Sequence, residues 1–390
     1  MNILHYKDDF NNRKVISLFS GAMGLDLGLQ KAGLEIAIGQ DFDKSCVNTM
    51  LANGHKALSG DIRNIEPATI LETVKLHQGE PFLICGGPPC QPFSTAGKRL
   101  GINDPRGSLF MDFIRMIDYI QPRFFIMENV KGIISSPLKS ADNEEQSTGT
   151  VLEVILEEFA KLGYKTVYGV LDAVNYGVPQ FRERFVLIGS RDNEDIYLPY
   201  PTHFQKHQNS FYRWKTLGDT IKDLEDNCGE CAAFSPERQH YLELIPEGGN
   251  WRNLPDDILR EAMGGAYTSG GGKVGFYRRL AYNQPSPTLV TSPIQKATMM
   301  CHPVKNRPLS VKEYARIQQF PEHWIFAGSL VAKYRQIGNA VPVGLAEALG
   351  NVVLSVADNT SEVFTKRFRG TNIHQKIKNA LELGGLAYAD

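Results

Sequence analysis

The first half of the chain alternates short apolar runs with amphipathic segments. The apolar runs are rich in Val, Ile, Leu and Phe and end at glycine or a polar residue, which predicts buried strands. These runs cover residues 15–21, 35–41, 81–87 and 123–129. Other segments repeat apolar residues every three or four positions, which predicts helices. These segments cover residues 25–33, 108–122 and 150–164. Because strands alternate with helices, we expect an α/β fold with a mostly parallel, doubly wound, Rossmann-like sheet.

End signals support two of the helices. Thr150 and Glu153 have the spacing of a capping box, and Gly163 supplies a stop ten residues later. Ser310 and Glu313 have the same spacing at the start of a second helix pattern. Both helices should therefore begin at the residue that follows the serine or threonine.

The pattern changes at about residue 193. From there to residue 306 the chain is rich in glycine, proline, asparagine and aromatic residues, with little periodicity. A stretch of this kind usually forms loops that carry a binding surface. Residues 343–357 are apolar enough to pack back onto the first part. The expected division is a catalytic and cofactor-binding domain at 1–192, a smaller irregular domain at 193–330 and a returning C-terminal segment at 331–390.

Composition adds few restrictions. The chain has 390 residues and a formal net charge of −1, so any polyanion must bind a local patch rather than the whole surface. No apolar run approaches the roughly 18 to 20 residues of a membrane span. The polar start, MNILHYKDDFNNRK, resembles no targeting peptide. We therefore expect a cytoplasmic protein with no membrane partner.

A local basic patch is present. From Ala262 to Lys312 the chain has no Asp or Glu. Its basic residues are Lys273, Arg278, Arg279, Lys296, Lys305, Arg307 and Lys312. A chance gap in acids is the alternative to a site for a polyanion.

The six cysteines are sparse for this length and predict reduced thiols. Cys46 and Cys85 lie in predicted elements and should be buried as small apolar residues. Cys228 and Cys231 form a single CxxC motif, for which a loop is a better interpretation than zinc. We expect no metal site.

Cys90 differs from these, because the stretch CGGPPCQPFS holds it in a proline-rich loop after a strand. Pro88, Pro89 and Pro92 keep that backbone extended. A thiol at a loop tip near basic residues such as Arg106 would have a lowered pKa and good access. Cys90 is therefore a candidate nucleophile.

Other polar side chains follow strands of the same sheet. Gly21 ends the first strand where a helix begins, a turn that lets a ligand approach the backbone. Asp41 could bind ribose hydroxyls, Phe42 could stack on a base, and Asp61 could accept from an exocyclic amine. These features favour a nucleotide-like cofactor, and a solvated loop acid is the alternative for each.

Glu128 ends another strand, so it should face the same crevice as Cys90 and could act as a general acid. Arg182 and Arg184 lie two apart on a predicted strand. Both should project from one face and hold an anion or orient a carboxylate. Surface charge is the alternative.

In this order, these residues resemble the DNA cytosine-5 methyltransferase family from Ser17 to about Val343. The matching stretches are SLFSG, the acidic strand end at Asp41, GDI, PPCQPFS, ENV, QFRER, RPLSVKEYARIQQFP and QIGNAVP. The resemblance implies S-adenosylmethionine as methyl donor, S-adenosylhomocysteine as product and a flipped cytosine in duplex DNA as acceptor. A compact chain without regulatory domains resembles a prokaryotic or phage modification enzyme. We therefore expect a monomer that protects host DNA from a restriction endonuclease.

The resemblance also implies site residues. The catalytic residues would be Cys90, Glu128, Arg182 and Arg184. The cofactor residues would be Phe19, Ser20, Gly21, Gly24, Asp41, Phe42, Asp61, Ile62, Gly87, Pro89, Asn339 and Ala340. The DNA-binding residues would be Gln91, Ser94, Arg106, Arg278, Arg279 and Thr288, with the acid-free stretch in the target-recognition domain.

One position departs from the family pattern. Met23 stands where a second glycine is common, and its side chain would narrow the cofactor turn unless it points away. We expect the fold to accommodate it. A tRNA cytosine methyltransferase, a nicotinamide-dependent oxidoreductase and a DNA-binding module without catalysis are the alternatives. The second lacks support because the turn after the first predicted strand, SGAMG, has no full GxGxxG motif.

Overall fold

The computed structural model describes residues 13–89, 109–136, 150–205, 212–268 and 274–360. Its centre is a seven-stranded sheet in the order β3-β2-β1-β4-β5-β7-β6. The strands are β1 Lys14–Leu18, β2 Glu35–Asp41, β3 Ala57–Ser59, β4 Leu83–Gly86, β5 Phe124–Val130, β6 Lys165–Asp172 and β7 Glu183–Ser190. The four strand runs expected from the apolar pattern are thus confirmed as β1, β2, β4 and β5.

The sheet is mostly parallel, as expected. Strand β7 is the exception, since it pairs antiparallel with both β5 and β6. A short connection joins β6 to β7, and a short connection favours an antiparallel pair because a parallel one needs a long crossover.

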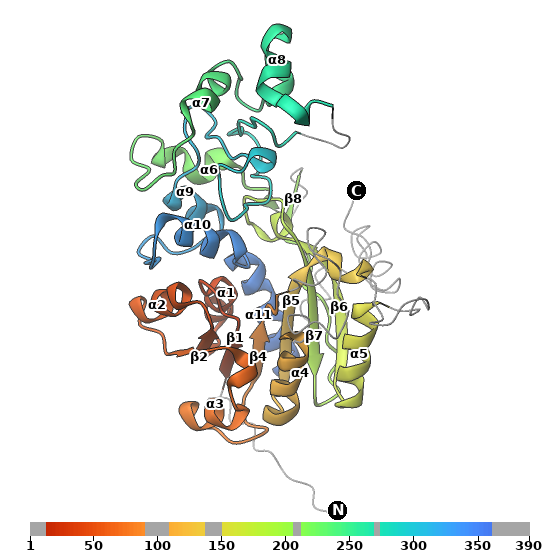
Figure 1. The fold of residues 1–390 in the computed structure, drawn as a ribbon. Coiled ribbons are helices and arrows are strands. Elements are labelled where there is room, and N and C mark those ends of the chain that lie inside the picture. Colours follow the sequence, from red (N-terminus) through yellow and green to blue (C-terminus); the bar gives the residue numbers. More distant parts are fainter. Residues whose placement is uncertain (1–12, 90–108, 137–149, 206–211, 269–273, 361–390) are drawn as a thin grey trace, which may run out of the picture.

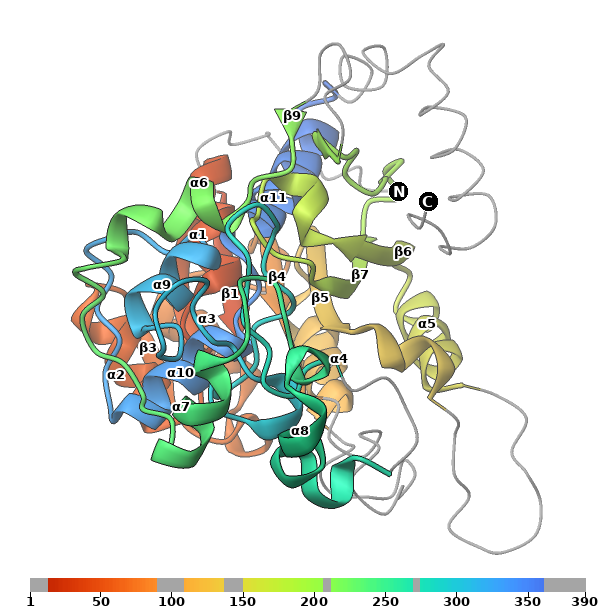
Figure 2. The ribbon, with the colours of Figure 1, turned by 90° about the horizontal axis from the view of Figure 1, so that it is seen from above.

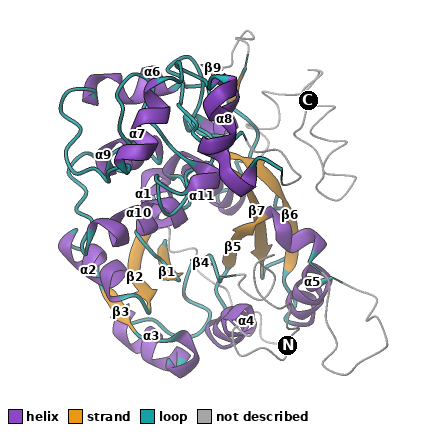
Figure 3. Ribbon diagram, turned by 45° about the horizontal axis from the view of Figure 1, so that its top comes forward, coloured by secondary structure: helices purple, strands orange, loops and turns teal. Residues whose placement is uncertain are grey.

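Helices cover both faces of the sheet (Figures 1 and 3). On one face, α3, α4 and α5 pack on residues such as Ile16, Leu18 and Phe125. On the other face, α1 and α11 pack on alternate residues such as Val15 and Leu83. The helices of this part are α1 Gly24–Ala32, α2 Lys44–Ala52, α3 Pro67–Val74, α4 Leu109–Ile120, α5 Val151–Lys161 and α11 Val343–Ala357. The last helix therefore packs back on the first part, as expected.

Both capping boxes form. Thr150 accepts from the Glu153 amide while the Glu153 carboxylate accepts from the Thr150 amide, and α5 begins at Val151. Ser310 and Glu313 do the same at the start of α9, Val311–Ile317. Gly163 has φ 80°, a left-handed conformation that suits the end of α5.

The region from 193 to 330 is built of short helices and loops and lies beyond one end of the sheet (Figure 1). Its elements are α6 Leu217–Ile221, α7 Pro236–Glu243, α8 Asp256–Met263, α9 and the small pair β8 His203–Phe204 and β9 Tyr212–Arg213. Two apolar clusters support it. One of them includes Tyr334 and Ile337 of α10, Leu330–Asn339, so this region packs on the returning segment.

One described stretch, Leu330–Ala357, is long and apolar enough to cross a membrane by length and composition, so the expectation that no part of the chain approaches such a span is wrong. It includes α10 and α11, and 72% of its most apolar window is buried inside the fold. Its apolar side chains therefore have a structural role in the core of the protein.

Seen from above, β1 and β4 lie near the middle of the fold (Figure 2), and their register pairs Leu18 with Gly86 at the carboxyl ends of the two strands. The chain leaves β1 toward β2 on one side, whereas β4 continues the sheet on the other. Ligands of doubly wound sheets bind at such a switch point, outside the carboxyl ends of the strands.

Candidate active site

The turn between β1 and α1 has an unusual backbone. Phe19, Gly21 and Met23 all have positive φ, at 55°, 55° and 69°. A side chain built on Gly21 would meet nothing within 4 Å, so the turn is open there. Helix α1 also begins without a side-chain cap, which leaves its positive end available to a polar ligand.

Met23 resolves the departure from the family pattern. Its side chain is fully buried and packs in a small cluster with Cys46 and Met50, behind α2. Met23 therefore adopts the left-handed backbone conformation that favours glycine, while its side chain points away from the turn. The accommodation that we expected is confirmed. A left-handed residue with a side chain costs about 1–2 kcal/mol, which burial of the thioether offsets.

Asp41 lies beside this turn. Its Oδ2 accepts from the Gly21 amide at 2.8 Å, and its Oδ1 accepts from the Asp43 amide at 2.8 Å. Burial raises the pKa of Asp41, while these amides lower it. Next to it Phe42 exposes 73% of its surface, an aromatic ring that the fold itself does not use.

Asp61 and Ile62 follow β3. The Asp61 carboxylate is paired with Arg63, which lowers the pKa of Asp61, and Ile62 is buried. At the far end of the chain, Ala340 approaches α1 closely. A side chain on Gly24 would lie 3.0 Å from Cβ of Ala340, so glycine permits this contact.

These residues fit a nucleoside-type cofactor. An open turn, an uncapped helix start, the Asp41 carboxylate and the exposed Phe42 ring lie at the ends of β1 and β2, and Asp61 follows β3, the next strand of the sheet. Ser20 is buried and hydrogen-bonded to Ser17, so its hydroxyl supports the turn. Asn339 is exposed at the end of α10, next to Ala340.

The chain beyond β4 leads toward the predicted nucleophile. Gly87 lies against Glu128, since a Cβ on Gly87 would come within 2.9 Å of Glu128 Oε2. Pro88 is buried and Pro89 is exposed. Cys90, Gln91, Ser94 and Arg106 lie outside the described residues.

Sequence reasoning overlooked Asn129. Its amide Nδ2 donates to the Pro88 carbonyl at 2.9 Å, and its side chain is buried. The bond ties the end of β5 to the two prolines that precede Cys90. Its place inside the ENV stretch was the available signal.

Glu128 and Arg184 form a nearly enclosed ion pair in this region. Arg184 Nε lies 2.7 Å from Glu128 Oε1, and the two side chains are only 12% and 11% exposed. They come from β5 and β7, where Glu128 faces Val186, two residues beyond Arg184. Burial raises the pKa of Glu128, and Arg184 and Arg182 lower it in part.

Arg182 is placed differently from Arg184. It is 1% exposed and donates to the carbonyls of Leu289 and Gly338, at 2.9 and 2.7 Å. The expectation that it holds an anion together with Arg184 is wrong, because its side chain is enclosed by backbone from two remote segments. Burial and the neighbouring Arg184 lower the pKa of Arg182.

The residues expected to bind DNA also differ in how accessible their side chains are. Arg279 is 6% exposed, and all five of its N–H groups donate within the protein, mainly to carbonyls. It cannot contact a phosphate in this arrangement, so its assignment is wrong. Arg278 is half-buried and donates to the Met299 carbonyl. Thr288 is exposed, and its hydroxyl donates to the Phe181 carbonyl at 2.8 Å.

The acid-free stretch is therefore not a uniform cationic surface. Arg307 forms two bonds to the buried carboxylate of Glu313, and Lys305 pairs with Asp226. Lys296 and Lys312 are exposed and have no ion pair among the described residues.

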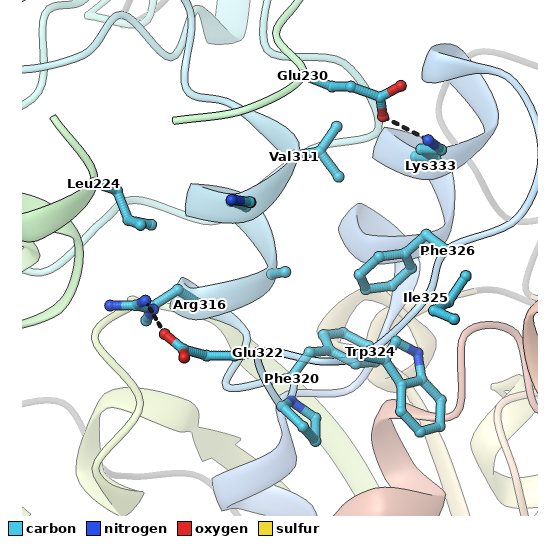
Figure 4. A pocket seen from close by; sticks show the side chains of 13 residues that line it. Leu224, Glu230, Val311, Arg316, Phe320, Glu322, Trp324, Ile325, Phe326 and Lys333 are labelled. Carbon is cyan, nitrogen blue, oxygen red and sulfur yellow. Dashed lines mark hydrogen bonds and ion pairs between the residues drawn. The ribbon is translucent and has the colours of Figure 1, made fainter. Parts of the chain in front are cut away.

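A cavity of about 430 Å³ lies elsewhere, between α9, α10 and the 320–326 loop (Figure 4). Aromatic side chains such as Phe320 and Trp324 line it, and two ion pairs, Lys333–Glu230 and Arg316–Glu322, cross its edges. Of the residues that line it, Lys312 belongs to the acid-free stretch, and none is among the expected catalytic, cofactor-binding or DNA-binding residues.

Known proteins resemble this chain over most of its length. A family model described as C-5 cytosine-specific DNA methylase matches residues 13–355. The Type II methyltransferase M.Sau96I of Staphylococcus aureus is 40% identical over 88% of this chain and 75% of its own. M.PspPI of Psychrobacter sp. is 39% identical over 87% and 78%, and M.Eco47II of Escherichia coli is 37% identical over 89% and 80%.

Solved structures share the fold. A putative DNA modification methyltransferase encoded in an Escherichia coli prophage superposes with a TM-score of 0.63 at 24% identity, covering 88% of this chain and 99% of its own. DNMT2 of Spodoptera frugiperda gives 0.53 at 20% identity, over 87% and 99%. Together with the family match over most of the sequence, these findings show that the chain belongs to the C-5 cytosine-specific DNA methylase family.

Proposed function

We propose that this DNA cytosine-5 methyltransferase modifies one cytosine within a specific duplex sequence, with S-adenosylmethionine as donor and S-adenosylhomocysteine as product. The buried Glu128–Arg184 pair, beside the strand end that leads to Cys90, is the observation that carries the proposal. A carboxylic acid and a fixed guanidinium suit the ring nitrogen and the carbonyl of a flipped cytosine.

In the proposed mechanism, the Cys90 thiolate adds to carbon 6 of the flipped base. Glu128 holds or donates a proton at ring N3, and Arg184 hydrogen-bonds the carbonyl, so negative charge in the ring is stabilised. Carbon 5 thereby becomes nucleophilic. Carbon 5 would then form a bond to the methyl carbon of the donor as the bond from that carbon to the sulfonium sulfur breaks. Loss of the carbon-5 proton to a base and of the Cys90 thiolate, with return of any N3 proton to Glu128, would restore the aromatic ring.

S-adenosylmethionine would bind at the turn after β1 and supply an electrophilic methyl group. Phe42 would stack on the adenine, and Asp41 and Asp61 would bind the ribose and the exocyclic amine. The exposure of the Phe42 ring and the open turn at Gly21 support this assignment. Gly87, Asn339 and Ala340 would complete the site.

The 193–330 region would read the DNA sequence from its loops, with cations such as Lys296 adding salt-dependent affinity. Thr288 would contact the DNA backbone. The names of the relatives, Type II methyltransferases, support a protective role alongside a restriction endonuclease. We further propose a cytoplasmic monomer that comprises the three parts 1–192, 193–330 and 331–390.

Two measurements test this function. Transfer of labelled methyl groups should occur on duplex DNA and not on tRNA, and the reverse result would favour a tRNA methyltransferase. Bisulfite sequencing of DNA from an expressing host should then show one methylated cytosine context. Unmodified host DNA, together with no transfer to duplex DNA in vitro, would refute the proposal.

A further inference from the structure

Two segments far apart in the sequence run side by side next to the Glu128–Arg184 pair. The Ser286 amide donates to the Pro179 carbonyl, and the Phe181 amide donates to the Ser286 carbonyl, each at 2.8 Å. The Thr288 hydroxyl adds a third bond, to the Phe181 carbonyl. The segment that carries Thr288 is thus fixed along the chain that enters β7.

Two buried side chains bind the backbone amide and the backbone carbonyl of Leu289, the residue that follows Thr288. Gln180 Oε1 accepts from the Leu289 amide at 2.9 Å, and Arg182 Nη1 donates to the Leu289 carbonyl at 2.9 Å. Gln180 is 0% exposed and Arg182 is 1% exposed. Water therefore cannot replace either bond.

Arg182 also reaches the end of α10 directly, and Gln180 reaches it only through the side chain of Gln318. Arg182 Nη2 donates to the Gly338 carbonyl at 2.7 Å, and Gln180 Nε2 donates to Gln318 Oε1 at 3.0 Å. Gln318, itself 0% exposed, donates to the Ala340 carbonyl at 3.1 Å. These carbonyls flank Asn339, at the edge assigned to the cofactor.

We propose that Gln180, Arg182 and Gln318 are positioning residues that couple the binding of duplex DNA to the binding of the cofactor. We call these three residues the connector. A shift of the Thr288 segment would leave buried donors and acceptors unpaired at both ends of the connector, which is costly in a low-dielectric interior. Each ligand therefore stabilises the arrangement that the other requires. The inference rests on the proposed function, because that function assigns Thr288 to DNA and residues 339–340 to the cofactor.

Calorimetric titration with S-adenosylhomocysteine, with and without a duplex that contains the methylated context, tests this coupling. In the unmodified protein, the duplex should lower the Kd of S-adenosylhomocysteine by about fivefold or more. Gln180→Met and Gln318→Met each remove connector bonds at similar side-chain volume. Either variant should bring this ratio close to one while each ligand still binds alone, so the test stands if one of them fails to fold.

Gln336→Met is the matched control. Gln336 is 2% exposed on α10 and also makes two bonds, but to Thr49 and to the Ala327 carbonyl. It should lose similar stability and keep the coupling. A ratio of one in the unmodified protein, unchanged coupling in both connector variants, or equal loss in Gln336→Met would overturn the inference. Failure of either ligand to bind the unmodified protein would refute the proposed function as well.

Discussion

Arg184 Nε lies 2.7 Å from Glu128 Oε1, between the antiparallel neighbours β7 and β5, with both side chains nearly enclosed. Burial penalises the carboxylate and raises its pKa, whereas the two arginines oppose that rise. Glu128 therefore keeps its proton to a higher pH than an ordinary glutamate, as a group that donates a hydrogen bond to cytosine N3 requires.

Glu128→Gln should lower kcat by about 10²–10⁴-fold, because the amide cannot supply a proton. Initial rates of methyl transfer measure this, with the affinity for S-adenosylhomocysteine as the control for an intact fold. In the unmodified protein, the rate should fall as pH rises through the raised pKa of Glu128. Arg184→Met removes a group that lowers this pKa, so the alkaline limb should move to higher pH. A limb that moves to lower pH would contradict the assignment.

Cys90→Ala should abolish methyl transfer and leave the binding of DNA and cofactor largely intact, because only the covalent bond to carbon 6 is lost. Radiolabel transfer and gel-shift titration measure the two properties separately. Full activity in this variant would refute the mechanism.

Met23→Gly should lower the free energy of unfolding by about 1–3 kcal/mol. The lost burial against Cys46 and Met50 costs more than the relief of the left-handed backbone gains. Denaturant unfolding measures the change, and Met23→Leu, which conserves volume, should cost less than about 1.5 kcal/mol. Affinity for S-adenosylhomocysteine should not rise, since the side chain points away from the turn. A large gain in affinity would show that Met23 narrows the site.

Asp26 predicts a pH dependence of stability. It is fully buried in α1, and neither carboxylate oxygen accepts a hydrogen bond of good geometry from the described residues, although Ser17 lies near. Burial raises the pKa of Asp26 from 3.8 to about 6. The contribution of protonated Asp26 to the free energy of unfolding is therefore complete below pH 4 and is lost as pH rises to about 6.

Asp26→Asn should remove this loss. Its free energy of unfolding relative to the unmodified protein should increase between pH 4 and pH 6 by up to about 3 kcal/mol and stay level above. Urea titrations at several pH values measure the difference. A difference that does not change with pH would mean that Asp26 is not desolvated in solution.

Arg279 should contribute to the stability of the fold rather than to a direct contact with DNA. Arg279→Lys leaves several buried carbonyls without a donor, so the free energy of unfolding should fall by at least about 2 kcal/mol. Thermal or denaturant unfolding measures this. Lys296→Ala, at an exposed position, should change stability by less than about 0.5 kcal/mol. Equal stability of the two variants would contradict the buried role of Arg279.

The sequence by itself determined much of the framework. The apolar runs gave the positions of β1, β2, β4 and β5, and the spacing of Thr150 with Glu153 gave the start of α5. Asp41 and Glu128 were also expected at one edge of the sheet, where their strands end. Such features depend on neighbours along the chain, through side-chain period, capping and the rule that parallel strands end at one edge.

Only the tertiary structure decided which charged candidates are enclosed by backbone and which form a pair at the candidate site. Arg182 and Arg184 are alike in sequence, yet Arg184 meets Glu128 while Arg182 is enclosed by the carbonyls of Leu289 and Gly338. Arg279 likewise meets carbonyls from segments more than twenty residues away. A guanidinium can be buried only where acceptors satisfy its donors, and those acceptors are backbone groups that every residue carries. Their positions are set by the packing of remote segments, so the local pattern of residues contains no signal for them.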